Sequence, residues 1–394
     1  MNVLIVQSRR SGNLISGEDT VIQRDIAELR KNNVNVSLKE LNIPIKGPIS
    51  IIRSISGLTW SFKNFIIIKK TIEKHKPDII HFHSLFPYLS ISVLYAAKIK
   101  KLPIVQTLHN VRWVCLEGSF FRKGKFCYKC INNLGFKGVI YGCSHGQIIS
   151  FFVFLNNFLL RRKIIKNPID KYIAVSKFIK DVHVKAGFIE KDIVVKSPYN
   201  ANYGIKVPKI RPLEKSLGIT FAGRISKAKG SEVLIEIIKN FNIQINIIGD
   251  GPEKNKIEKI CIENDFKHVS FFGSITNKET KKIISKSFCI VIPSQCSEAL
   301  SMTAIESISS FVPVVSSNIG GLGELIDETK CGLTVDSRNP SEFIDSINLL
   351  IKSPNLYLRC IENCAKFLSS KKDNQFLIDI YMSVSSEKSH DNCI

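Results

Sequence analysis

The sequence predicts an α/β protein with two doubly wound domains, each built around a parallel sheet. Its 394 residues are enough for two domains at ~100–200 residues per domain. In both halves, short apolar segments typical of buried strands alternate with segments of helical periodicity, as in parallel sheets covered by helices on both faces. Glycine and charged residues follow several of these strands, at the sheet edge where ligands bind in open α/β folds.

Breaks in this alternation predict the domain boundaries. Prolines interrupt the pattern over residues 198–214, so we expect an N-terminal domain over residues 1–200 and a C-terminal domain over residues 201–372. The remaining residues, 373–394, form a tail. It begins with an amphipathic segment at 374–381, which predicts a helix.

The N-terminal half carries histidines at predicted strand ends. Strands are predicted in the segments 2–6, 76–83, 102–110 and 172–177. The second segment ends in His83, and His109 lies near the end of the third. A lone histidine in such a place is more often structural than catalytic, so the positions alone leave both interpretations open.

The C-terminal half places cations and glycines after its strands. Strands are predicted at 219–222, 243–248, 269–273, 288–292 and 314–315. After the first strand, Gly223 opens a loop that carries Arg224 and Lys229. Arginine forms forked hydrogen bonds and lysine supplies a mobile charge, so both can neutralise a diphosphate. Gly249 and Gly251 follow the second strand and allow a tight turn close to a ligand.

Two glutamates flank a predicted loop-to-helix junction after the fourth strand. Pro293 ends that strand, and Ser301 or Thr303 can cap the next helix. Glu298 then lies just before the helix and Glu306 inside it. The N–H groups and dipole of a helix start can hold a diphosphate, with Glu298 near sugar hydroxyls and Glu306 near a ribose. Two such glutamates alone are more often ordinary surface residues.

Together, these motifs resemble family 4 of the retaining glycosyltransferases. The match extends over residues 217–335 and depends on the order and spacing of four motifs, namely Gly223–Gly230, Gly249–Glu253, Glu298–Glu306 and Gly320–Glu324. The resemblance implies the GT-B fold, in which two Rossmann-like domains face an interdomain cleft and a carboxyl-terminal helix can cross back onto the first domain. It also implies sugar transfer from a nucleoside diphosphate to an acceptor hydroxyl with retention of anomeric configuration.

The resemblance assigns a role to each candidate residue. The implied catalytic residues are His109, Arg224, Lys229 and Glu298, and the implied donor-binding residues are Gly17, Gly223, Gly249, Gly251, Leu300, Ser301, Met302, Thr303 and Glu306. The cations and the helix start would stabilise the leaving diphosphate. The histidine and the first glutamate would contact the sugar, and the second glutamate would contact the ribose.

The chain departs from the family pattern at two places. Ser16 replaces one of two adjacent glycines in the loop that includes Gly17, and Ala299-Leu300-Ser301 stands where the family often has glycine or proline followed by an aromatic residue. The second departure leaves the donor sugar open. Because no Asp-x-Asp metal motif occurs in the right context, we expect catalysis without a cofactor.

Four of the eleven cysteines lie within a predicted insertion at residues 112–146. Cys127-Tyr-Lys-Cys130 has the spacing that lets two thiolates face one metal ion, and Cys115 and Cys143 lie to either side. We therefore predict a structural zinc site with these four ligands and with His145 as a substitute ligand. Four reduced thiols without a metal ion are the alternative.

The composition predicts anionic partners. Lys and Arg total 56 against 34 Asp and Glu, a net charge of +22 that attracts phosphorylated substrates, nucleic acid or anionic lipid. No nucleic-acid-binding motif accompanies this charge, so we expect no nucleic acid partner.

The apolar stretch Ile148–Leu160 is well short of the ~20 residues that span a bilayer. Its aromatic residues and the following Arg161–Lys163 suit either a membrane interface or a core helix.

These observations predict a cytoplasmic enzyme with peripheral association at the inner face of the plasma membrane. Its expected partners are a nucleoside-diphosphate sugar and a glycan acceptor, for which we expect a lipid-linked glycan of bacterial surface polysaccharide synthesis, either O-antigen or capsule. Three alternatives remain. The first is a GT-B epimerase that acts on a sugar nucleotide. The second is a phosphorylase-like enzyme, which would need a pyridoxal lysine and usually a much longer chain. The third is a non-catalytic basic binding protein that carries zinc.

Overall fold

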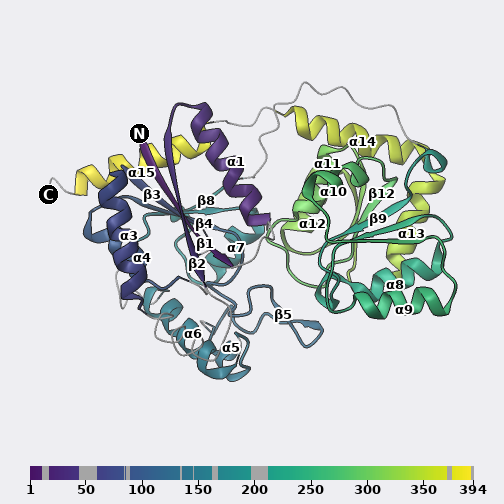
Figure 1. Ribbon diagram of the computed structural model, residues 1–394, viewed down its shortest axis with the longest axis horizontal. Coiled ribbons are helices and arrows are strands. Elements are labelled where there is room, and N and C mark those ends of the chain that lie inside the picture. The colour runs from purple at the N-terminus through teal and green to yellow at the C-terminus, as the bar shows by residue number, and fades with distance from the viewer. Residues whose placement is uncertain are drawn as a thin grey trace. The chain divides into compact units, whose positions relative to one another are not determined.

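The computed structural model divides the chain into two compact units (Figure 1). Unit 1 comprises Met1–Phe120, Cys127–Pro198 and Asp373–Ile394, and unit 2 comprises Phe121–Phe126 and Tyr199–Lys372. The structure describes residues 1–10, 17–43, 60–83, 85, 89–133, 135–144, 146–161, 167–196, 212–370 and 375–391. Ser16, His145 and most of the predicted boundary at 198–214 lie outside these residues.

Unit 1 is built on a parallel sheet with the strand order β2-β1-β3-β4-β7-β8. Its strands are β1 (Asn2–Arg10), β2 (Asn35–Ile43), β3 (Ile79–His83), β4 (Ile104–Leu108), β7 (Lys171–Ala174) and β8 (Ile193–Val195). Its helices are α1 (Gly17–Lys31), α3 (Phe62–His75), α4 (Ser92–Ile99), α5 (Phe136–Ile140), α6 (Gln147–Arg161), α7 (Lys177–Lys185) and α15 (Phe376–Asp391). Strands β3 and β4 are buried along their whole length, as expected when helices cover both faces of a sheet.

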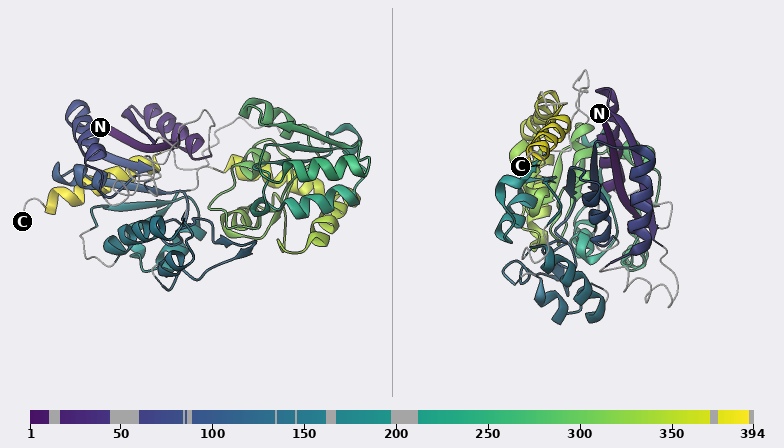
Figure 2. Two further views of the ribbon diagram at one scale, coloured as in Figure 1. Left: turned by 60° about the horizontal axis from the view of Figure 1, so that its bottom comes forward. Right: turned by 90° about the vertical axis from the view of Figure 1, so that its left-hand side faces the viewer.

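The last helix of the chain packs against unit 1. Leu377 and Tyr381 of α15 are buried in one cluster with Val3 and Ile5 of β1. Figure 2 shows this helix, in yellow, against the elements of unit 1. The amphipathic pattern predicted a helix from residue 374, and the structure confirms the helix from Phe376 onward.

Unit 2 contains a second parallel sheet, with the strand order β11-β10-β9-β12-β13-β14. Its strands are β9 (Ile219–Ala222), β10 (Ile245–Ile248), β11 (Val269–Gly273), β12 (Cys289–Ile292), β13 (Val314–Ser317) and β14 (Gly332–Val335). Its helices are α8 (Ser231–Asn240), α9 (Lys254–Glu263), α10 (Asn277–Ile284), α11 (Met302–Ser309), α12 (Gly320–Thr329), α13 (Pro340–Lys352) and α14 (Pro354–Ser369). The strand order reverses between β9 and β12, and such a switch point is where doubly wound sheets bind ligands.

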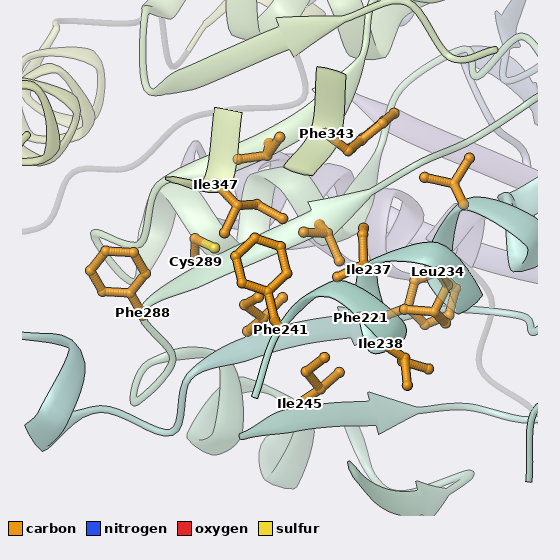
Figure 3. Packing of buried hydrophobic residues seen from close by; sticks show 14 of the residues in the cluster. Phe221, Leu234, Ile237, Ile238, Phe241, Ile245, Phe288, Cys289, Phe343 and Ile347 are labelled. Atoms are coloured by element: carbon orange, nitrogen blue, oxygen red, sulfur yellow. The ribbon is translucent and has the colours of Figure 1, made fainter. Parts of the chain in front are cut away.

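Helices cover both faces of the unit 2 sheet. Figure 3 shows one face, where Phe221 of β9 packs with Leu234 of α8 and Phe343 of α13. Strand β12 contributes to both faces because successive side chains of a strand alternate in direction. Cys289 therefore joins this cluster, while Ile290 packs on the opposite face. Burial on both faces explains why the strand is a continuous apolar run.

The structure confirms the predicted fold class of two Rossmann-like units with parallel sheets. The strand predicted from residue 243 begins at Ile245. Gly320 and Gly321, the first residues of the fourth motif, form the first turn of α12. Glycine is a poor helix former, but this helix buries Leu322 and Ile326, and that packing outweighs the local preference.

Candidate functional site

Two loops of unit 2 meet at the switch point between β9 and β12. The first loop follows β9 and includes Lys229, and the second follows β12 and begins at Pro293. A Cβ atom at Gly230, whose φ is +80°, would lie 1.9 Å from the carbonyl oxygen of Pro293. Only glycine allows this approach, so the backbones of the two loops are in direct contact.

Lys229 and Glu298 form an ion pair across these loops. The Nζ atom of Lys229 lies 2.9 Å from Oε1 of Glu298, whose side chain is 10% exposed. The Ser294 hydroxyl donates a hydrogen bond to the same carboxylate oxygen. The backbone N–H of Gly321 donates to the carbonyl oxygen of Glu298 at 2.7 Å. Glu298 is thus fixed through both its side chain and its backbone.

The ion pair keeps Lys229 charged. Burial acts to lower the pKa of Lys229, but the charges of Glu298 and Cys296 and the hydrogen bond to Glu298 outweigh it and raise the pKa above the ordinary lysine value. Arg224 lies in the same loop with its side chain exposed. The loop therefore presents two cations at the switch point.

Helix α11 begins at the same place. Ser301 is its N-cap, and the Ser301 hydroxyl accepts a hydrogen bond from the Ala304 N–H at 3.4 Å. The Thr303 hydroxyl donates to the carbonyl oxygen of Ala222 at 3.2 Å, which ties the first helical turn to the end of β9. Glu298 precedes the helix and Glu306 lies within it, as predicted. A helix start carries N–H groups and a partial positive charge that favour an anion.

The glycine turn after β10 lies beside the cationic loop. Gly249 has a φ of +125°, and a Cβ atom there would lie 2.0 Å from the carbonyl oxygen of Gly223. The Ile225 N–H donates to the carbonyl oxygen of Asp250 at 2.9 Å. The tight turn predicted from Gly249 and Gly251 thus brings the backbone close to the β9 loop. Leu300 and Met302 are partly buried near the start of α11.

Three histidines form a group in unit 1, in which His81 and His83 are buried and His109 is half-buried. His109 follows β4, and its Nε2 lies 2.8 Å from Nδ1 of His83 at the end of β3. His81 lies between two hydroxyls, with Tyr381 Oη at 2.7 Å and Thr107 Oγ1 at 2.8 Å. Burial lowers the pKa of each histidine, to about 3 for His81. The three imidazoles are therefore neutral at neutral pH.

A pocket adjoins His109 within unit 1. It is lined by Leu85, Gln106, Thr107, Leu108, His109, Asn110, Arg112 and Trp113. The Asn110 amide donates to Oε1 of Glu18 at 3.4 Å, and Glu18 follows Gly17 in the first turn of α1. This contact joins the first turn of α1, which begins at Gly17, to the residue that follows His109.

The predicted zinc ligands differ in burial. Cys115 and Cys130 are buried, and the Cys130 thiol donates to the carbonyl oxygen of Gly135 at 3.8 Å. Cys127 and Cys143 are half-buried. Among the residues that the structure describes, no three His, Cys, Asp or Glu side chains are grouped as metal ligands would be.

The sequence stretch considered for a membrane interface forms α6. One side of the helix is buried through Val153 and Leu160, while Ile148 and Phe151 are 67% and 45% exposed. Within the described ranges, no helix has the length and apolar character needed to cross a bilayer. The buried side is that of a core helix, and the membrane interface stays a prediction.

Two contacts of the site were not predicted from the sequence. Ser294 contacts Glu298, and its signal was its position directly after a strand-ending proline at the switch point. His83 contacts His109, and its signal was its position at the end of the strand next to β4. Both positions could be read from the sequence. Which loops lie next to each other, however, depends on the order of the strands in the sheet.

Comparisons with known proteins identify the family. A model described as Glycosyltransferase Family 4 matches residues 27–197, and one described as Glycosyl transferases group 1 matches residues 205–367. An uncharacterized glycosyltransferase of Methanocaldococcus jannaschii is 26% identical over 82% of this chain and 78% of the relative. An O-antigen biosynthesis glycosyltransferase of Escherichia coli is 26% identical over 70% of each chain.

A solved structure shows the same fold. The structure of HepE from Anabaena in complex with UDP has a TM-score of 0.64 and 15% identity, and covers 99% of this chain and 100% of that one. The family models and the glycosyltransferase relatives set aside the epimerase and the non-catalytic binding protein considered from the sequence. The two family models together span most of the chain, which belongs to family 4 of the glycosyltransferases and is a glycosyltransferase with the GT-B fold.

Proposed function

We propose that the enzyme transfers a sugar from a nucleoside diphosphate to a glycan hydroxyl with retention of anomeric configuration. The Lys229–Glu298 ion pair at the unit 2 switch point, directly before α11, is the observation that carries this proposal. The Anabaena protein was solved with UDP, which supports a nucleotide donor. The donor sugar is left unassigned because Ala299-Leu300-Ser301 departs from the family pattern.

The cations are assigned to the leaving group. Breaking the bond between sugar and diphosphate places negative charge on the diphosphate. Lys229, Arg224 and the start of α11 supply positive charge at one place, and such preorganised charge often makes the largest contribution to catalysis. These groups can neutralise the leaving diphosphate by themselves, so we propose transfer without a catalytic cofactor.

The remaining residues are assigned to the sugar and the nucleoside. Lys229 and Ser294 both contact Oε1 of Glu298, so Oε2 can accept hydrogen bonds from sugar hydroxyls. Glu306 lies further along α11 and is assigned to the ribose. His109 is assigned to the sugar as a neutral hydrogen-bonding group, because burial lowers its pKa. Four glycines are assigned to bringing the backbone close to the donor, namely Gly17, Gly223, Gly249 and Gly251.

A panel of nucleotide sugars tests this function. We expect one nucleotide sugar to raise the Tm of the purified full-length enzyme and to support glycan synthesis after magnesium is chelated. NMR of the product should show the anomeric configuration of the donor. An inverted product would overturn the retaining mechanism. Absence of transfer with every donor and acceptor tested would count against the proposed substrates.

The acceptor is proposed to be a lipid-linked glycan of bacterial surface polysaccharide synthesis, reached at the cytoplasmic face of the membrane. The similarity to an O-antigen biosynthesis glycosyltransferase supports this class of acceptor. Helices α5 and α6 lie side by side (Figure 1) and expose apolar residues to solvent. These are Phe136, Ile140, Ile148 and Phe151, each at least 45% exposed. The exposed Lys129 nearby and the net charge of +22 suit an anionic lipid surface.

Replacing Ile148 and Phe151 with serine is expected to weaken vesicle binding by at least about tenfold, because each loses roughly 1.5–3 kcal/mol of apolar burial. Sedimentation with vesicles of anionic and zwitterionic lipid measures this effect, and binding of the wild type should fall as salt rises. Ile262→Ser is the matched control, because Ile262 is 80% exposed on α9 of unit 2. Equal binding of all variants would contradict the assigned surface.

A further inference from the structure

Two histidines of unit 1 share a hydrogen bond that can run in either direction. Nδ1 of His83 lies 2.8 Å from Nε2 of His109. Burial lowers the pKa of both imidazoles, so each ring is neutral and carries one proton. One ring must therefore donate to the other. The direction decides which nitrogen of His109 is protonated, and hence whether His109 offers a ligand a donor or an acceptor.

The second ring nitrogen of His83 limits the choice. Nε2 of His83 is buried, and it has no hydrogen-bond partner within the described ranges. If His109 donated, the proton of His83 would lie on Nε2, and a buried N–H would lack an acceptor. Orphaned N–H groups of this kind are rare in native proteins, and acceptors with too few donors are less so. If His83 donates from Nδ1, its Nε2 is left only with a lone pair.

Another buried histidine of unit 1 shows the second arrangement without ambiguity. Nδ1 of His183 in α7 lies 2.7 Å from the carbonyl oxygen of Ile179, one turn earlier in the helix. A carbonyl oxygen only accepts hydrogen bonds, so the proton of His183 must be on Nδ1. Nε2 of His183 is then a bare nitrogen, and it too is buried with no partner in the part of the chain that the structure describes. The fold therefore accommodates a buried imidazole with a bare Nε2.

Neighbouring side chains fix the ring of His83. His81 lies two residues earlier on β3, and its ring centroid is 4.2 Å from that of His83. The ring of His81 is held at both nitrogens, by the hydroxyl groups of Tyr381 and Thr107. All four side chains are buried. Because buried side chains are closely packed, His83 keeps its Nδ1 directed at His109.

His109 is the member of the pair that a ligand can reach. It is half-buried and lines the pocket of unit 1. Among the described residues, its one hydrogen bond is that between Nε2 and His83. When Nε2 accepts from His83, the proton of His109 lies on Nδ1, which is the nitrogen that remains for a ligand.

We propose that His83 is a positioning residue, which donates from Nδ1 to Nε2 of His109 and thereby holds His109 as a hydrogen-bond donor. The hydrogen bond made by one imidazole nitrogen sets the protonation of the other. His109 then presents an N–H to an oxygen of the donor sugar, and the other tautomer, whose bare Nδ1 could not donate, is disfavoured. This role rests on the proposed function, because the acceptor oxygen belongs to the nucleotide sugar.

NMR of the wild-type enzyme without nucleotide tests the protonation directly. In protein labelled with nitrogen-15 histidine, long-range proton–nitrogen spectra distinguish protonated from bare ring nitrogens. We expect His83, His109 and His183 each to carry the proton on Nδ1 at neutral pH. Single replacement of each histidine by asparagine assigns its signals. A proton on Nε2 of His83 or His109 in the wild type would overturn the proposal.

Two variants of His83 with the same branched shape test the consequence for sugar transfer. Asparagine places an amide N–H close to the position of Nδ1 and can donate to His109, whereas leucine cannot. His83→Leu is expected to lower kcat/KM about fivefold to tenfold, the effect of one neutral hydrogen bond, and His83→Asn should stay within about twofold of the wild type. His183→Leu is the matched control and should keep the wild-type kcat/KM, because His183 bonds only to its own helix among the described residues.

The protonation of His109 separates positioning from a purely structural role. In His83→Leu, part of the His109 population should carry its proton on Nε2, whereas loss of packing alone would lower the Tm and leave the proton on Nδ1. Wild-type kcat/KM in His83→Leu, or an equal loss in His83→Asn, would overturn the role of His83. If no nucleotide sugar supported transfer, the proposed function would fail, but the wild-type spectra would still decide the direction of the hydrogen bond.

Discussion

Replacing Glu298 with glutamine is expected to lower kcat/KM for sugar transfer by roughly 10²–10³-fold, the effect of losing one preorganised polar group in an active site. Glutamine keeps the shape of the side chain but removes the charge that holds Lys229 at 2.9 Å. Hydrogen bonds to charged groups contribute about 1.5–3 kcal/mol, so the free energy of unfolding should fall without loss of the fold. Initial rates at varied donor concentration, with thermal melts, measure both effects.

The structure offers a matched control for this variant. Glu236 of α8 pairs with Lys239 at 2.9 Å, the same separation as in the Lys229–Glu298 pair, but both side chains are more than 40% exposed. Glu236→Gln should therefore keep wild-type activity. If Glu298→Gln and Glu236→Gln were equally active, the assignment of Glu298 to the donor sugar would be wrong.

Local features of the site could be predicted from the sequence because they depend on neighbouring residues. Ser301 caps α11 as expected, since capping needs only a hydroxyl and a free N–H three residues later. Strand β12 was recognised from an apolar run that ends at a proline. The same reasoning placed Glu298 before the helix and Glu306 inside it.

Contacts between distant residues could not be predicted in the same way. Lys229 and Glu298 are 69 positions apart, and they meet only because β9 and β12 are adjacent strands. The contact of His81 with Tyr381 spans 300 positions and requires the last helix to pack on unit 1. Strand order and the position of the last helix depend on how whole sheets and helices pack together. Short sequence motifs contain no information about that packing.

Replacing Lys229 with methionine is expected to lower kcat by about 10²–10³-fold, with a smaller effect on the KM for the donor. Methionine keeps a linear apolar side chain and removes the charge. A charge that neutralises the leaving diphosphate acts most strongly when that group departs, so the loss should appear mainly in kcat. Steady-state kinetics measures the two constants, and Lys239→Met is the matched control on α8.

The pH dependence has a definite sign. Interaction with Glu298 raises the pKa of Lys229 above its ordinary value of 10.5, despite the opposing effect of burial. The stabilisation from the charged lysine is therefore fully present below pH 10.5 and is lost only as pH rises through the folded-state pKa. Wild-type activity should show no loss from Lys229 between about pH 7 and 10. A loss in that range that disappears in Lys229→Met would contradict the raised pKa.

The double variant of Lys229→Met and Glu298→Gln separates two possible roles of the lysine. If Lys229 served only to hold Glu298, adding Lys229→Met to Glu298→Gln would cause no further loss, because the interaction would already be broken. We expect a further fall in kcat, since the proposed role of Lys229 is a direct contact with the diphosphate. The fall should be smaller than in the single variant, because the two side chains share a hydrogen bond and their effects are not independent.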